Sequence, residues 1–183
     1  MQYNFSNFKT ELKKAGEHLS KEYSQLSTGR ASPMVLDGVS VEIYGDYQPI
    51  KNIASVNIED PKTLRIAPWD KGQIKAIEKA IMAANLGLSV ATDDMGIRVI
   101  FPQLTTETRQ TLVKVLKAKM EDAKIVVRKV REEVLDDVAA HEKEGKMNED
   151  EKFSAKEDIQ KLVVEANNNL EAIFEKKEIE VLG

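Results

Sequence analysis

Apolar residues recur every three or four positions in three stretches of the chain, the spacing that places them on one face of an α-helix. Gly29 and Pro33, which disfavour a continuing helix, follow the first stretch. Three amphipathic helices predict a three-helix bundle. The apolar positions are Phe8, Leu12, Ala15, Leu19, Tyr23 and Leu26, then Leu112, Leu116, Met120, Ala123, Val127, Val130, Val134 and Val138, and finally Ala155, Ile159, Leu162, Ala166, Leu170 and Ile173.

Capping residues give the ends of the two later helices. Thr105 is placed to cap the second helix, with Glu107 in its first turn, and Gly145 ends it. Asn148 and Glu151 have the spacing of a cap for the third helix. At ~1.5 Å per residue, a second helix of about forty residues is roughly 60 Å long. A small bundle does not need that length for its core, so we expect the length to serve function.

Between the first and second helices the pattern changes to the two-residue alternation of β-strands. It predicts strands at residues 39–43, 54–58, 64–66 and 97–101. A helix is expected to begin at Asp70, with Gln73 three residues later as in a capping box, and to be closed by Gly87. This helix should cover one face of the sheet and make a small β/α/β domain.

The predicted fold class is therefore α+β, an elongated antiparallel three-helix bundle with a small inserted domain. Residues 1–30 and 104–183 form the bundle, and residues 31–103 form the insert. The chain crosses between them twice, which predicts a two-strand hinge near residues 30–33 and 102–104. The expected hinge residues are Arg30, Ala31, Ser32, Pro33, Pro102, Gln103 and Leu104.

Composition narrows the function classes. The chain has no cysteine and no run of about eighteen apolar residues, which disfavours a disulfide scaffold and a membrane partner. No secretory leader is recognised, so a cytoplasmic protein is expected. The net charge of −4 argues against a generic nucleic-acid binder, whose domain is usually basic. A nucleic-acid site would have to be a local patch.

Charge is segregated along the second long helix. Residues 109–131 carry eight basic and two acidic side chains, a net of +6, whereas residues 132–151 carry nine acidic and two basic ones, a net of −7. The helix dipole acts only over the terminal turns and does not explain this. At about 100° per residue, five of the basic residues share one arc beside the apolar stripe: Arg109, Lys117, Lys124, Arg128 and Arg131.

Two interpretations of this basic row stay open on the residues alone. Lysine and arginine at the edge of an apolar seam often lay their stems along it and keep the charged group in water. Alternatively, the row contacts successive phosphates of a nucleic-acid backbone. Arg128 and Arg131, one turn apart, favour phosphates because a guanidinium binds them with two donors.

Conventional active-site patterns are absent. His18 and His141 have no cysteine or nearby second histidine with which to share a metal, and Asp93 to Gly96 is typical of a turn. We therefore expect no catalytic residue, no metal and no cofactor. The alternatives to an RNA-binding factor are a helical scaffold or chaperone-like protein-binding module, and an enzyme centred on the insert.

Several motifs occur in a fixed order: Thr28-Gly29-Arg30-Ala31-Ser32-Pro33, Leu36-Asp37-Gly38, Val41-Glu42-Ile43-Tyr44-Gly45, Glu78-Lys79-Ala80-Ile81, Leu86-Gly87-Leu88, Ile97-Arg98-Val99, Pro102-Gln103-Leu104-Thr105, Arg109 and Val127-Arg128-Lys129-Val130-Arg131. In this order and spacing the whole chain resembles bacterial ribosome recycling factor. The resemblance implies an L-shaped monomer that binds large-subunit ribosomal RNA after termination. With elongation factor G and GTP hydrolysis, it would split the ribosome into subunits.

The resemblance also points to particular residues. Arg131 matches the arginine on which the family's activity most depends, and Arg128, Arg109 and Arg30 match other RNA-contacting arginines. Lys129, Lys124 and Lys117 complete the expected RNA-binding set. The chain departs from the family's usual arginine or asparagine at five positions: Ser27, Thr108, Lys129, Glu132 and Leu135. Lost arginines should weaken phosphate attraction and its salt dependence.

Overall fold

The computed structural model describes residues 3–183, which fall into two compact units. One unit contains the chain up to Lys21 together with Gln110–Gly183, and the other is Glu22–Arg109. The dividing points lie within the helices α1 (Ser6–Ser24) and α3 (Thr106–Lys143). Each unit has its own core and is described separately.

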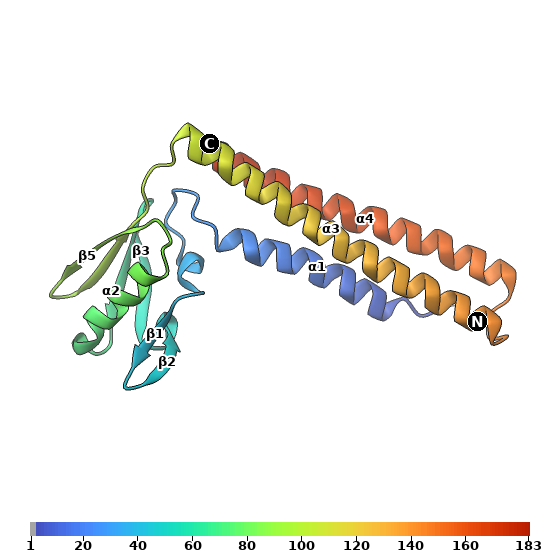
Figure 1. Ribbon diagram of the computed structural model, residues 1–183, viewed down its shortest axis with the longest axis horizontal. Coiled ribbons are helices and arrows are strands. Elements are labelled where there is room, and N and C mark those ends of the chain that lie inside the picture. The colour runs from blue at the N-terminus through green and yellow to red at the C-terminus, as the bar shows by residue number, and fades with distance from the viewer. Residues whose placement is uncertain (1–2) are drawn as a thin grey trace. The chain divides into compact units, whose positions relative to one another are not determined.

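The first unit is a bundle of three helices, α1, α3 and α4 (Glu149–Leu182). They run side by side, with α3 antiparallel to both others (Figure 1). The stripes predicted from sequence supply much of the core, because Leu19, Leu116 and Leu170 are almost fully buried. The predicted stripe of α4 was incomplete, since three further residues of that helix are buried: Val163, Phe174 and Val181.

The predicted caps of the long helices are confirmed. Thr105 Oγ1 accepts a hydrogen bond from the backbone N–H of Thr108 at 3.1 Å. Asn148 and Glu151 form a reciprocal capping box with bonds of 2.8 and 2.9 Å. Gly145 has a φ of 70°, the left-handed conformation that ends many helices. Gly145 and the Asn148 capping box lie at the two ends of the turn between α3 and α4.

The second unit is built from antiparallel strands and one α-helix, α2 (Ile74–Ala83). Four strands form a sheet in the order β3-β4-β6-β5. The strands β1 and β2 form a separate hairpin (Figure 1). Ile77 and Ile81 of α2 pack in one core with strand residues such as Leu64, so the helix covers the sheet as predicted. The strands are β1 (Ser40–Ile43), β2 (Asp46–Pro49), β3 (Ala54–Asp60), β4 (Thr63–Pro68), β5 (Ser89–Asp93) and β6 (Gly96–Ile100).

The prediction of only four strands was wrong, because β2 and β5 were missed. Both are edge strands, bonded to a neighbour on one side only. Most of their residues are exposed, so neither shows the alternation of buried and exposed positions that marks a half-buried strand. Their pairing depends on hairpin turns rather than on an apolar pattern. The Tyr44–Gly45 turn, with φ of 53° and 91°, joins β1 to β2.

The predicted start of the short helix is confirmed in part, because Asp70 caps a 3₁₀ turn that continues into α2, and its predicted end was wrong. Asp70 accepts a hydrogen bond from the N–H of Gly72 at 2.9 Å and caps a 3₁₀ turn, while α2 begins only at Ile74. The helix stops at Ala83, before Gly87. Asn85 has a φ of 49°, so an asparagine takes the left-handed position that we expected of glycine.

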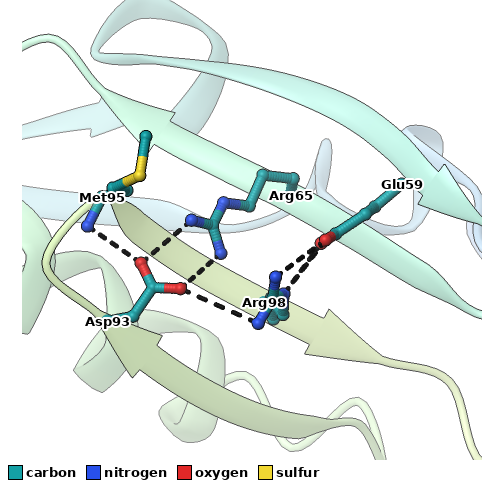
Figure 2. A network of polar contacts seen from close by, with 5 residues as sticks. All are labelled: Glu59, Arg65, Asp93, Met95 and Arg98. Carbon is teal, nitrogen blue, oxygen red and sulfur yellow. Dashed lines mark hydrogen bonds and ion pairs between the residues drawn. The ribbon is translucent and has the colours of Figure 1, made fainter.

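Ion pairs join all four strands on the face of the sheet away from α2. Asp93 of β5 accepts from both terminal nitrogens of Arg65 of β4, at 2.6 and 2.9 Å (Figure 2). Arg98 of β6 forms a two-donor pair with Glu59 of β3, in which its Nη2 and Nε are each 2.9 Å from a carboxylate oxygen. The hydrogen bonds from these arginines hold the pKa of Asp93 and of Glu59 below their usual values. Residues 93–96 form the hairpin turn between β5 and β6, as predicted, because Asp93 pairs with Gly96 and accepts a hydrogen bond from the N–H of Met95.

The two chain crossings lie next to one another within the second unit. A side chain at Gly29, whose φ is 80°, would lie 3.4 Å from the carbonyl oxygen of Pro102. The turn between β3 and β4 anchors both segments. The N–H of Ala31 donates to Pro61 O at 2.9 Å, and the N–H of Phe101 donates to Lys62 O at 2.8 Å.

Candidate nucleic-acid interface

Arg131 stands at the boundary between the core and the surface of α3. Its side chain is half-buried, and its Nε is shielded from solvent without a hydrogen-bond partner among residues 3–183. A buried donor that lacks an acceptor carries a desolvation cost of about 1–3 kcal/mol. The shielded Nε is not open to an anion from solvent, so an external phosphate would meet the terminal nitrogens of the guanidinium group instead.

Arg128 and Lys129 lie on the turn of α3 that precedes Arg131, and both are exposed. In the described part of the chain, neither side chain makes an ion pair or a hydrogen bond. Glu132 is exposed too, and no ion pair joins it to Arg131 within residues 3–183. The carboxylate therefore does not neutralise its neighbour, and three cationic groups remain uncompensated within one helical turn.

Lys124 and Lys117 have partners within the bundle. Lys124 Nζ is 2.9 Å from a carboxylate oxygen of Glu171 on α4 and 3.8 Å from one of Glu121. The hydrogen bond that Lys124 donates to Glu171, together with the charges of both carboxylates, raises the pKa of Lys124. Lys117 Nζ lies 6.0 Å from the ring centroid of Phe174, within reach of a cation–π contact. The contacts of these two lysines agree with the first interpretation of the basic row, in which the side chains lie along the edge of the apolar seam of the bundle.

Arg30 and Arg109 belong to the other compact unit and flank the two crossings. Arg30 is exposed and precedes Ala31, the residue anchored to Pro61. Arg109 is half-buried, and its Nε donates to the carbonyl oxygen of Leu104 at 3.5 Å. The predicted row is therefore not uniform. Its members differ in burial, in partners and in the unit to which they belong.

Two exposed apolar residues beside the basic turn were not predicted from the sequence. Ile125 is 56 % exposed and Val126 is 48 % exposed, although both are large and apolar. Apolar side chains are normal on a surface when single, but here two adjacent ones precede Arg128. The sequence contains a signal for this exposure, because neither residue lies at a position of the apolar stripe that includes the buried Met120 and Val127. These two side chains place exposed apolar surface next to the turn that carries Arg128, Lys129 and Arg131.

The acidic half of α3 makes contacts within the bundle. Asp137 accepts a hydrogen bond from the hydroxyl of Tyr3 and lies 3.6 Å from His141 Nδ1. Burial, followed by the bond to Asp137, raises the pKa of Tyr3 to about 12. Glu142 pairs with Lys152 of α4. Partnered and unpartnered side chains thus occur in both the basic and the acidic stretch, so the charge segregation read from the sequence does not by itself separate them.

The arrangement suits anion binding rather than covalent chemistry. Residues 3–183 contain no cluster of three or more histidine, cysteine or acidic side chains that could hold a metal. Within the same residues, no helix is long and apolar enough to cross a membrane. Two guanidinium groups and an ammonium group without partners among the described residues are donors of the kind that bind anionic oxygens such as those of phosphate.

The matches to known proteins agree with one another in the family that they indicate. The family model described as ribosome recycling factor matches residues 19–182. The chain is 38 % identical to the ribosome-recycling factor of Staphylococcus carnosus over 178 residues, with 97 % of each protein covered. It is 40 % identical to that of Enterococcus faecalis over 174 residues, covering 95 % of this chain and 94 % of the relative.

Two solved structures extend the likeness to three dimensions. The first is a solution structure of ribosome recycling factor, with a TM-score of 0.76, 34 % identity, and coverage of 100 % of this chain and 99 % of the other. The second is a Thermus thermophilus ribosome recycling factor described, with Escherichia coli elongation factor G, as bound to the E. coli post-termination complex. It has a TM-score of 0.65, 36 % identity, and coverage of 98 % and 97 %.

Proposed function

Because the chain belongs to the ribosome recycling factor family, we propose that it binds the post-termination ribosome and helps to split it into subunits. A similar protein is described together with elongation factor G on that complex, and we extend this partnership to the present chain. The family consists of translation factors that are not enzymes, so GTP hydrolysis belongs to elongation factor G. The site of action is the cytoplasm, and the active form is a monomer.

The observation that carries the proposal is the state of Arg131. Its buried Nε lacks an acceptor among the described residues, and Arg128 and Lys129 beside it lack partners too. A phosphate placed against this turn would accept from the guanidinium of Arg131 and meet two further positive charges. We infer that large-subunit ribosomal RNA binds here. The set extends to Arg109 and Arg30 beside the crossings, with Lys117 and Lys124 contributing at most long-range attraction.

We further propose that the two crossings act as a hinge, with a bundle of residues 1–30 and 104–183 and an insert of residues 31–103. The bonds from Ala31 and Phe101 to the β3–β4 turn tie the insert's ends of both crossings to its sheet. Rotation would then concentrate on the bundle side of these two anchors, at Arg30 and at Pro102, Gln103 and Leu104, while Ser32 and Pro33 would move with the insert. A hinge of this kind lets elongation factor G move one domain while RNA holds the other.

Splitting of purified post-termination complexes tests the function. Subunit separation can be followed by light scattering with elongation factor G and GTP. We expect Arg131→Ala to reduce the splitting rate about tenfold or more, because one charge-assisted hydrogen bond contributes about 1.5–3 kcal/mol. Arg98→Ala is the matched control, since it removes one arginine that already has a partner. Wild-type splitting by Arg131→Ala would overturn the assignment of this residue, and a wild-type chain unable to split complexes would overturn the function.

A further inference from the structure

Two buried side-chain polar atoms lack a hydrogen-bond partner among residues 3–183, and they complement one another. One is Nε of Arg131 on α3, which can only donate, and the other is Oδ1 of Asn167 on α4, which can only accept. Buried polar groups in native proteins are nearly always hydrogen-bonded, so each of these two atoms needs an explanation. A donor and an acceptor on adjacent helices explain each other if they lie in the same place.

The ion pair between Lys124 and Glu171 gives the register of α3 against α4. Because the two helices are antiparallel (Figure 1), residues after Lys124 face residues before Glu171. Arg131 is seven residues after Lys124, about 10 Å along α3, and Asn167 is four residues before Glu171, about 6 Å along α4. A long helical side chain extends toward the N-terminus of its helix, which brings Nε of Arg131 back toward the level of Asn167.

Both side chains also come from the helix faces that meet in this ion pair. At about 100° per residue, Arg131 lies within about 20° of Lys124 around α3, and Asn167 lies within about 40° of Glu171 around α4. Asn167 is one turn from the buried Val163, which places its amide in the apolar seam of the bundle. The donor and the acceptor therefore share one part of the seam between α3 and α4.

We propose that Asn167 positions Arg131 for RNA, because its Oδ1 supplies the acceptor for the buried Nε–H. Buried water typically joins polar groups that have no protein partner, so one water molecule is placed between the two atoms. The guanidinium group is planar, and holding its Nε–H toward α4 fixes the direction in which its terminal nitrogens point. Those nitrogens are the ones that an external phosphate meets. Only the role in RNA binding rests on the proposed function, since the pair itself belongs to the isolated chain.

NMR of the isolated full chain tests the pair. The Nε–H proton of Arg131, assigned by its loss in Arg131→Lys, should resonate downfield of that of the exposed Arg128 and exchange with solvent at least about tenfold more slowly. Asn167→Leu fills the same space without an acceptor and should move the signal upfield, whereas Asn167→Asp keeps an acceptor and should leave it downfield. Asn168→Leu is the control, because it makes the same change at the next residue, which is exposed. An unchanged signal in Asn167→Leu overturns the proposal.

A double-mutant cycle tests the positioning of Arg131. Asn167→Leu should weaken ribosome binding about three- to tenfold in equilibrium sedimentation, the effect of one neutral hydrogen bond. It should cause no further loss in the Arg131→Ala background, while the loss should persist in the Lys129→Ala background. An equal loss in the Arg131→Ala background would mean that Asn167 only supports the bundle, and would overturn the proposal. A wild-type chain that does not bind ribosomes would contradict the proposed function instead, because the Nε–H signals decide the pair without ribosomes.

Discussion

Arginines on the sheet of the second unit have carboxylate partners, whereas Arg128 and Arg131 on α3 of the bundle have none among the described residues. Arg65 and Arg98 extend over the sheet face, and each donates two hydrogen bonds or more to a carboxylate on another strand (Figure 2). Arg131 has a buried Nε without an acceptor, and Arg128 has no partner among the described residues. The same type of side chain is paired with carboxylates on the sheet and has no such partner among the described residues on α3.

The difference teaches that positive charge alone does not mark an RNA site. Counted from the sequence, Lys124 and Arg128 look equivalent, since both belong to the basic stretch of α3. Their environments separate them, because Lys124 is paired with Glu171 and Arg128 is not. An interface should therefore depend on unpartnered cations far more than on partnered ones. Three substitutions examine this, in decreasing order of expected effect.

Replacing Arg131 with lysine keeps the charge but removes the planar fork and the buried Nε. An ammonium group is a compact, strongly hydrated charge and cannot reproduce two-donor binding of a phosphate. We expect Arg131→Lys to weaken ribosome binding about tenfold, the loss of one charge-assisted hydrogen bond at the lower end of its range. Arg98→Lys should bind ribosomes normally. Equal affinity for wild type and Arg131→Lys in equilibrium sedimentation would mean that charge alone matters.

Two lysines five residues apart on α3 provide a finer comparison. Lys129→Ala should reduce ribosome affinity by a few-fold, because it removes an exposed charge without a partner in the described chain. Lys124→Ala should change affinity less than about twofold, and should lower bundle stability by up to about 1 kcal/mol through the lost pair with Glu171. Sedimentation and chemical denaturation measure the two effects. A larger affinity loss for Lys124→Ala would reverse the assignment of partnered and unpartnered groups.

Acid should weaken the ion pairs of the sheet. The pKa values of Asp93 and Glu59 are lowered in the folded chain, mainly by hydrogen bonds from Arg65 and Arg98. A group with a lowered folded pKa stabilises the fold above its unfolded pKa, near 4, and loses that contribution as the pH falls. We expect the melting temperature to fall between about pH 5 and pH 3, and Asp93→Asn/Glu59→Gln to reduce that fall. An identical pH dependence in the double variant would show that these pairs are energetically neutral.

Periodic burial explains what could be predicted from the sequence. The three bundle helices and the central strands β4 and β6 bury one face, so their apolar positions repeat visibly. The caps at Thr105 and Asn148 could also be predicted, because a cap depends on residues that are close together in the sequence. The edge strands β2 and β5 were not, since exposure removes the pattern that reveals a strand.

The candidate site was predictable as a charge pattern but not as a set of contacts. The basic row indicated α3, and the resemblance selected Arg131 within it. Glu171 is 47 positions from Lys124 in the chain, so sequence gave no sign that it holds that lysine. In the same way, nothing local to Arg131 indicates that its Nε is buried without an acceptor. Both facts arise from packing between helices.

The central claim is that unpartnered arginines on α3 contact RNA phosphates. The salt dependence of ribosome binding is its most direct test. Two double variants make the same change of net charge, Arg128→Ala/Arg131→Ala on the bundle and Arg65→Ala/Arg98→Ala on the sheet. Each phosphate contact contributes roughly −0.7 to −0.9 to the slope of log affinity against log salt. The bundle variant should therefore lower the magnitude of the slope by roughly 1.5, and the sheet variant should leave it unchanged. Equal slopes for both variants would contradict the claim.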